Sequence, residues 1–230
     1  MYFKNRIDAG RLLAQALIKY KGSDVVVYAV PRGGVVTAVE IARILRAPLD
    51  LIIVRKIGHP FQPEYAIGAV AEDGHTVRNE KVMESVDKNW LKNEIEAQRQ
   101  EAKRRREKYL RGRKDIPVEG KTAILIDDGI ATGLTIRLAV KELKHRNPKK
   151  IVVAVPVSAK ATADKIKQEV DEFVALDMPG ESEFLGAVGS YYDEFFPVED
   201  AEVIALVRSY DREFIESLHP LHSALQKLFG

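Results

Sequence analysis

Two adjacent carboxylates, Asp127 and Asp128, stand between a short apolar run and a stretch of small and hydroxyl residues. The apolar run, AILI at residues 123–126, is typical of a buried strand, and the residues from Thr135 onward have helical spacing. Because the carboxyl ends of parallel strands open onto the ligand sites of α/β proteins, both carboxylates are expected at such a site. Neighbouring carboxylates repel each other, so suitable partners are vicinal hydroxyl groups, as on a ribose, or a divalent cation.

The loop that follows the carboxylates has the composition of a phosphate-binding site. Small residues leave backbone N–H groups unobstructed, and the start of the next helix adds about half a positive charge. The lysine of an ATP-binding P-loop is missing, since Leu134 follows Gly133. An ordinary helix cap would need one aspartate, so a phosphate cradle beside a ribose clamp is the favoured interpretation. The cradle comprises Gly129, Ile130, Ala131, Thr132, Gly133, Leu134 and Thr135.

A second glycine-containing turn, PRGG at residues 31–34, follows another short apolar run. Gly33 and Gly34 are able to present backbone N–H groups, and Arg32 is able to bind phosphate oxygens through a forked pair of hydrogen bonds. Arg55 and Lys56 come at the end of the next apolar run, where they are either aimed at the same anion or solvated.

The elements that must position these residues alternate between strands and helices along the chain. This alternation predicts an α/β fold with a doubly wound, mainly parallel sheet in three α/β/α layers. A hairpin that turns at Asp73-Gly74 and a long helix, capped by Asp87 or Ser85 and ending near Leu110, interrupt the alternation after the second strand. The expected strands are 25–30, 49–54, 122–126, 151–155 and 172–176, the expected helices are 6–20, 35–45, 135–146 and 161–170, and further helices close the chain.

Composition excludes several classes of site. The chain of 230 residues has 46% hydrophobic residues and no cysteine, which excludes disulfides, thiolate nucleophiles and cysteine metal sites. No apolar run approaches the length of a membrane span, and the N-terminus lacks the apolar core of a signal peptide. We therefore expect a cytoplasmic protein without a membrane partner.

Charge is unevenly distributed, although the formal net charge is only +2. The segment 99–114 has nine lysines and arginines against two glutamates, whereas the segment 169–202 has eleven acidic residues and no lysine or arginine. The basic segment is either an arm that faces an anion or a surface neutralised by the acidic segment, across the fold or a dimer contact.

The thirteen residues AILIDDGIATGLT (123–135) resemble the signature of the type I phosphoribosyltransferases. The resemblance implies that Asp127 and Asp128 bind the ribose hydroxyls of 5-phosphoribosyl-1-diphosphate (PRPP) and that the cradle wraps its 5′-phosphate. It implies that the PRGG turn, with Arg32, Gly33 and Gly34, holds the pyrophosphate, joined by Arg55 and Lys56. It also implies Mg²⁺ bound through PRPP, with Asp127 and Asp128 as further ligands.

The activity implied is that of a pentosyl-transferring glycosyltransferase of nucleotide metabolism, which attaches the phosphoribosyl group to a nitrogenous base with inversion at C1. The acceptor base is not fixed by the sequence. Ala131 occupies the position where enzymes for hypoxanthine and guanine usually have an aspartate, which disfavours a 6-oxopurine. A PRPP-sensing regulator, or a nucleic-acid-binding protein without transferase activity, is the alternative.

The segment RKIGHPFQPEYAIGAVAEDG (55–74) is similar to a subgroup known only as predicted phosphoribosyltransferases. The expected organisation is one domain over residues 1–230, with a hairpin and long-helix insertion at 57–118 and a C-terminal hood with helices at 177–230. Tyr191 and Tyr192 in the hood either stack on the base or belong to the core.

The basic helix of the insertion leaves two interpretations open. Arg104, Arg105 and Arg106 either close over PRPP or pair with another subunit or with nucleic acid. A homodimer is expected, and nucleic acid is the least favoured of these partners, because the helix has few aromatic residues to stack on bases.

Overall fold

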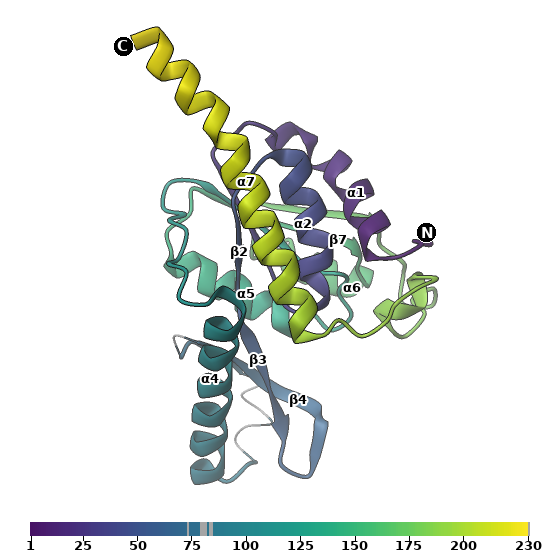
Figure 1. Ribbon diagram of the computed structural model, residues 1–230. Coiled ribbons are helices and arrows are strands. Elements are labelled where there is room, and N and C mark those ends of the chain that lie inside the picture. Colours follow the sequence, from purple (N-terminus) through teal and green to yellow (C-terminus); the bar gives the residue numbers. More distant parts are fainter. Residues whose placement is uncertain (73, 79–81, 83–84, 230) are drawn as a thin grey trace.

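The computed structural model describes residues 1–72, 74–78, 82 and 85–229, and its core is a sheet of five parallel strands (Figure 1). From β1 the chain crosses to β2 on one side, and from β6 it crosses to β7 and then β8 on the other. The predicted doubly wound, mainly parallel sheet is therefore confirmed. In spatial order the strands are β2 (Leu49–Leu51), β1 (Val25–Ala29), β6 (Thr122–Ile126), β7 (Lys150–Val157) and β8 (Glu172–Asp177).

Helices cover both faces of this sheet, because its strands are apolar on both faces (Figure 1). In β1, Val25 and Val27 pack among α1, α2 and α7, whereas Val26 and Tyr28 pack on the opposite side among residues of α5 and α6. The helices are α1 (Arg6–Ala16), α2 (Gly33–Leu45), α5 (Leu134–His145), α6 (Lys160–Ile166) and α7 (Asp200–Phe229), with short 3₁₀ turns at Ile18–Tyr20 and Val188–Tyr191.

A second, antiparallel sheet lies below the main body and is enclosed between α4 (Lys88–Leu110) and α5 (Figure 1). Ile57 and Ile67 face α4, where Leu91 and Ile95 pack against them. The opposite face packs on Leu138 of α5. The strands are β3 (Val54–His59), β4 (Gln62–Ala71) and β5 (Thr76–Arg78), and of the predicted turn between the last two, Asp73 lies outside the described residues.

The apolar run Leu49–Val54, predicted as one strand, is divided between the two sheets. Its ladder with β1 stops after the Ile52 N–H donates to the Ala29 carbonyl at 3.0 Å, because β1 ends there and the chain turns at a proline. The prediction that Arg55 and Lys56 end a strand of the central sheet is therefore wrong. Both residues lie within β3 of the small sheet.

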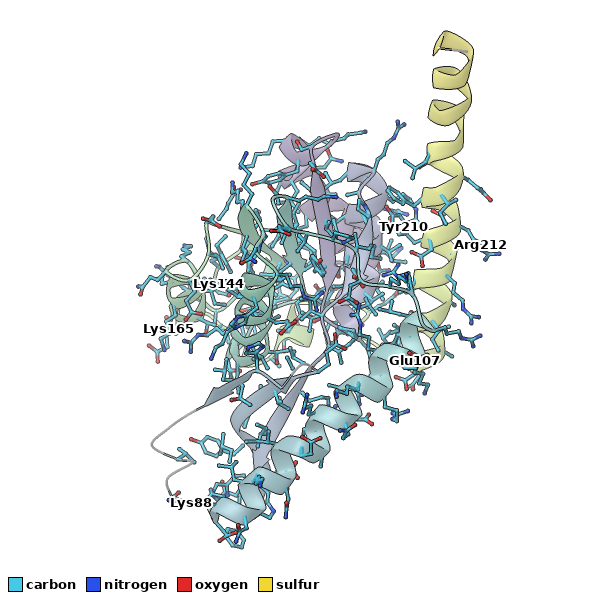
Figure 2. All side chains as sticks on the ribbon, turned by 90° about the vertical axis from the view of Figure 1, so that its left-hand side faces the viewer. Lys88, Glu107, Lys144, Lys165, Tyr210 and Arg212 are labelled. Carbon is cyan, nitrogen blue, oxygen red and sulfur yellow. The ribbon has the colours of Figure 1, made fainter. Side chains whose placement is uncertain are left out.

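Residues with capping preferences mark both ends of the long helix α4. The Asp87 carboxylate caps it by accepting a hydrogen bond from the Trp90 N–H at 2.8 Å. It ends at Arg111 and Gly112, whose φ angles of 48° and 76° are in the left-handed region. Figure 2 shows α4 running from Lys88, at the far end of the small sheet, to Glu107 beside α7.

The C-terminal region differs from its prediction in the number of helices. One helix, α7, closes the chain instead of several, and α6 ends at Ile166, earlier than predicted. Tyr210 of α7 points into the body, where its hydroxyl donates to the Ala47 carbonyl at 2.6 Å, while Arg212 points away (Figure 2). Within the described residues, no helix combines the length and apolar character needed to cross a membrane.

A buried carboxylate joins the end of α4 to the central sheet. Asp50 of β2 is 0% exposed and accepts hydrogen bonds from Arg113 at 3.0 Å, Arg106 at 3.5 Å and the Ile116 N–H at 3.1 Å. Each arginine also donates to a carbonyl of β2 at 2.9 Å. Two guanidinium groups therefore compensate one charge that the sheet has removed from water.

A contact inside the fold joins the basic segment at 99–114 to the acidic segment at 169–202. Lys108 pairs with Asp200, at 2.6 Å. Arg113 pairs with Asp211 of α7, also at 2.6 Å, but that carboxylate lies beyond the acidic segment. Neutralisation by the acidic segment, one of the two interpretations of the basic segment, therefore accounts for Lys108.

Replacing the buried carboxylate should cost the protein much of its stability. We expect Asp50→Ala to lower the free energy of unfolding by roughly 3 kcal/mol, because Arg106 and Arg113 would lose the fully buried carboxylate that they share. Their remaining ion pairs, with Asp115 and Asp211, involve carboxylates closer to solvent. Urea unfolding followed by circular dichroism measures the change. Asp164→Ala, which breaks exposed pairs with Lys160 and Lys167, is the control and should leave the midpoint nearly unchanged. Equal midpoints for both variants would contradict this account of Asp50.

Candidate functional site

The candidate site lies where β1 and β6 run side by side, at the point where the strand order reverses. The carboxyl end of β1 leads into the PRGG turn, and the carboxyl end of β6 leads into Asp127 and Asp128. The Val30 N–H donates to the Ile126 carbonyl at 3.0 Å, so the strands stay paired up to these two loops. In α/β proteins this position forms the ligand crevice.

The two loops touch each other, and glycine is what permits the contact. A Cβ atom added to Gly33 would lie 1.9 Å from Oδ2 of Asp128 and 2.9 Å from Nε of Arg6. A Cβ atom added to Gly34 would lie 3.0 Å from both the Cα and Oδ1 of Asp127. Any larger residue at Gly33 would displace the carboxylate, so the turn and the aspartate pair form one unit.

Asp128 is fixed by Arg6, which the sequence analysis did not identify, and by Tyr192, for which it predicted other roles. Nε of Arg6, the first residue of α1, donates to Oδ2 of Asp128 at 2.7 Å, and the Tyr192 hydroxyl donates to the Asp128 carbonyl at 2.6 Å. Arg6 is itself held, because its guanidinium lies 3.7 Å from the ring centre of Phe195 and donates to the Phe196 carbonyl at 2.8 Å. An arginine at a helix start has no sequence signal that would point to this role.

Asp127 has an environment that opposes its negative charge. Burial raises the pKa of Asp127 well above its usual range, and the nearby charge of Asp128 raises it further. The Asp128 N–H donates to Oδ1 of Asp127 at 2.9 Å, and Arg6 offsets part of the repulsion. Donors from vicinal hydroxyl groups, or a cation, would stabilise the ionised pair.

The small-residue loop at residues 129–135 is held in place by hydrogen bonds to neighbouring segments. It leads into α5, whose first N–H groups have no hydrogen-bond acceptor within the helix. The Ile130 N–H donates to the Val157 carbonyl at 2.9 Å, and the Thr162 hydroxyl donates to the Ala131 carbonyl at 2.7 Å. Gly133 has a φ of +75° at the helix start, where a Cβ atom would lie 2.5 Å from the Thr162 side chain. The structure therefore combines a rigid loop with a helix N-terminus, which suits an anion.

The three predicted cations lie around the same crevice. Arg32 is partly exposed and lies 3.7 Å from Glu199 and 3.6 Å from Asp200, at the start of α7. Arg55 and Lys56 line a cavity of about 550 Å³ whose inner end is formed by Pro31 and Thr135, one residue from each loop. Both cations therefore lie close to the site, although they belong to β3 of the small sheet and not to the central sheet.

The three arginines predicted to close the site form ion pairs with carboxylates of the chain, although Arg105 also lines the cavity beside Arg55. Nε of Arg104 and Nε of Arg105 both bind the Glu101 carboxylate, at 2.7 and 2.8 Å, and Arg106 belongs to the group around Asp50. Arg104 and Arg105 stabilise the negative charge of Glu101 and lower its pKa to about 2. A closing movement would have to break these ion pairs.

The rings of Tyr191 and Tyr192, predicted either to stack on a base or to belong to the core, are core residues in this structure. They are only 3% and 7% exposed and contact Phe3, Phe184 and Phe195. The Tyr191 hydroxyl accepts a hydrogen bond from the Leu185 N–H at 3.0 Å, which ties the hood segment together.

Among the described residues, no group of three or more His, Asp or Glu side chains is placed to hold a metal ion. The two carboxylates of the site are adjacent, and one of them is already bound by Arg6. They suit a cation that brings most of its own ligands, such as one carried by substrate phosphates.

A family model and the curated relatives of this chain point to the same family. The family model described as "Phosphoribosyl transferase domain" matches residues 2–183. The chain is 41% identical over 217 residues, 94% of its length, to "Putative phosphoribosyl transferase Rv0571c" of Mycobacterium tuberculosis strain H37Rv, and equally so to its counterpart in strain CDC 1551. It covers 48% of these proteins, so it spans about half the length of the curated relatives it matches.

A solved structure covers nearly the whole chain. The crystal structure of TT1426 from Thermus thermophilus is 39% identical, with a TM-score of 0.77 over 91% of this chain and 99% of that one.

The raised pKa of Asp127 predicts a gain in stability from an uncharged replacement. A carboxylate whose pKa is raised by folding contributes stability at low pH and loses it as the pH rises through the folded-state pKa. Asp127→Asn should therefore have a higher melting temperature than the unmodified protein near pH 7, and the difference should shrink towards about pH 4. Differential scanning calorimetry without ligand measures it. A variant that is less stable near pH 7, or a gain independent of pH, would contradict the prediction.

Proposed function

Since the chain belongs to the phosphoribosyl transferase domain family, we propose that it transfers the 5-phosphoribosyl group of PRPP to a nitrogenous base and releases pyrophosphate. The observation that carries this proposal is the contact between the glycine turn after β1 and the carboxylate pair after β6. The family makes the protein a glycosyltransferase-type enzyme, and the proposal adds the donor, the cation and the class of acceptor.

Each part of the donor has a matching group in the crevice. The N–H groups of the loop at residues 131–135 and the start of α5 bind the 5′-phosphate, whereas the Ile130 N–H already donates to Val157. The carboxylates of Asp127 and Asp128 accept hydrogen bonds from the ribose hydroxyls. The PRGG turn and the cations Arg32 and Lys56 bind the diphosphate, with Arg55 next to them. The sugar is then fixed at both ends and by its hydroxyl groups.

The reaction needs little covalent help from the protein. The bond from the acceptor nitrogen to C1 forms as the bond from C1 to the diphosphate oxygen breaks, and that bonding pair leaves on the diphosphate. A proton on the attacking nitrogen passes to solvent. Fixing the two reactants in this geometry contributes roughly 7–11 kcal/mol towards lowering the barrier, and the cations beside the PRGG turn stabilise the negative charge that develops on the leaving group.

Magnesium is proposed to bind together with the diphosphate of PRPP. The carboxylates of Asp127 and Asp128 are oxygen ligands of the kind that Mg²⁺ prefers, and together with substrate phosphates and water they would complete its coordination. When bound, the ion neutralises charge on the diphosphate. Arg6 keeps its hydrogen bond to Oδ2 of Asp128 in this arrangement, so the other carboxylate oxygens are the ones directed to substrate and cation.

The proposed reaction is tested by release of pyrophosphate from PRPP and Mg²⁺ in the presence of purine, pyrimidine and pyridine acceptors. Release that depends on one acceptor, with the matching ribonucleotide identified by mass spectrometry, is the expected result. Tight PRPP binding without release for any acceptor, combined with PRPP-dependent retention on DNA or RNA, would instead support the PRPP-sensing regulator.

The carboxylate pair gives a direct test of the donor site. We expect the double variant Asp127→Asn/Asp128→Asn to lose PRPP binding by about a hundredfold or more, because two charged acceptors are lost, while its circular dichroism spectrum stays unchanged. Isothermal titration calorimetry with PRPP and Mg²⁺ measures the loss. The variant Asp164→Asn, on the exposed surface of α6, is the matched control. Equal affinity of the double variant and the unmodified protein would refute the assignment.

A further inference from the structure

The cavity of about 550 Å³ beside the candidate site has two ends with different surroundings. Its inner end is formed by Pro31 and Thr135, from the two loops of the crevice. Its outer part lies between β3 and α4 and contains Arg55, Trp90 and Gln98. We call the whole space the β3–α4 cavity. Four of its side chains come from one stripe of α4, at Trp90, Glu94, Gln98 and Arg105.

Volume and position single out this cavity among those that the described residues form. Pockets for small organic ligands measure about 300–1,000 Å³. The cavity beside the hood segment, which Arg6 and Phe196 line, measures about 170 Å³ and is too small for a substituted ring. Three other cavities fall in this range: one of about 560 Å³ on the outer surface of α5, at Arg137 and Lys144, one of about 520 Å³ between α4 and α7, and one of about 390 Å³ at Phe61. Each is lined by no residue of the two loops.

Arg55 is a partly buried cation that forms no ion pair with a carboxylate among the described residues. Its Nε donates a hydrogen bond to a neutral group, Oε1 of Gln98, at 3.0 Å. Burial lowers the pKa of Arg55, and the like charge of Arg105 lowers it further, while the charges of Glu101 and Glu94 offset part of this effect. Glu94 is the carboxylate that lines the cavity, and Gln98 separates it from Arg55 by donating to it at 2.9 Å. An anionic group on a ligand would compensate this charge.

The alternation of side chains along β3 separates its two cations. Arg55 shares a face of the strand with Ile57, which packs against α4, and Lys56 shares the other face with Val54, which packs against residues of α5. Lys56 is therefore on the side of the phosphate loop, whereas Arg55 is on the side of Trp90. The two residues are suited to different anions.

The remaining walls suit a flat ring with polar edges. β3 is an edge strand of the small sheet, so one row of its backbone N–H and C=O groups is not used by β4. Trp90 is half-buried and supplies a broad aromatic surface. A planar heterocycle beside Arg55 would find hydrogen-bonding groups on β3 and on Gln98, with Trp90 further along the same cavity.

We propose that the β3–α4 cavity is the acceptor subsite and that it takes a planar nitrogen heterocycle bearing a carboxylate, which pairs with Arg55. This inference rests on the phosphoribosyl transfer proposed above and names its acceptor class. The ring nitrogen is then presented towards the inner end of the cavity, where the loops hold the sugar. The hood tyrosines, whose rings are covered, take no part in acceptor binding.

Binding to the cavity has a readout that does not depend on catalysis, because Trp90 is the single tryptophan of the chain. Tryptophan fluorescence of the full chain is titrated with two matched pairs of probes: pyridine-3-carboxylate against pyridine-3-carboxamide, and uracil-6-carboxylate against uracil. We expect at least one carboxylate to quench the fluorescence saturably, with an affinity about tenfold or more above that of its uncharged partner. The proposal is overturned if neither carboxylate quenches, or if charged and uncharged partners bind equally.

Two variants locate the carboxylate. Arg55→Gln should weaken binding of the carboxylate probe by about tenfold or more and leave the uncharged partner unchanged. Lys144→Gln, which removes a cation from the cavity on α5 (Figure 2), should change neither. An unchanged carboxylate affinity in Arg55→Gln overturns the assignment of Arg55, and circular dichroism confirms that the variant is folded.

Failure of this inference and failure of the proposed function give different results. PRPP binding by calorimetry, with pyrophosphate release to an uncharged base and no fluorescence response to either carboxylate, would overturn the acceptor assignment alone. A specific fluorescence response that Arg55→Gln abolishes, without any PRPP binding, would keep the carboxylate pocket and overturn its role as an acceptor subsite together with phosphoribosyl transfer.

Discussion

The organisation of this protein depends on keeping two adjacent carboxylates at the edge of a sheet that is otherwise apolar. Asp127 and Asp128 repel each other, and burial increases the free-energy cost of their ionisation. The fold limits that cost with Arg6 on Asp128, and it admits the pair only because Gly33 and Gly34 have no side chain. The N-terminal residues and the hood segment are then required to hold Arg6, which explains why Phe195 and Phe196 contact it.

The buried charges of the structure fall into two kinds. Asp50 is satisfied by two arginines and a backbone N–H, which gives it no capacity for a ligand. Asp127 and Arg55 are not satisfied in this way: one has a neighbour of the same sign, and the other has a neutral partner. Groups that are poorly compensated in the free protein are the ones expected to bind ligands, because a ligand then removes an existing penalty.

Much of this arrangement followed from the sequence, and the reason differs between elements. The strands β1, β6 and β7 and the helix α5 were predicted closely, because strands buried on both faces and helices with periodic apolar residues have strong local signals. The division of Leu49–Val54 was missed, since an apolar run does not show where its partner strand ends. Arg6 and the role of Tyr192 were missed for a related reason: their contacts join residues more than sixty positions apart.

The position of α4 determines how the insertion contributes to the site. Its first turn is capped by Asp87 and packed on the small sheet, and its last turns are tied to the central sheet through Arg106 and Asp50. Moving α4 as a body would separate that ion pair and leave a buried carboxylate with one partner fewer, which is strongly destabilising. The helix therefore acts as a fixed wall of the β3–α4 cavity. A fixed wall would bind a ligand by preformed shape and charge, with little entropy lost on binding.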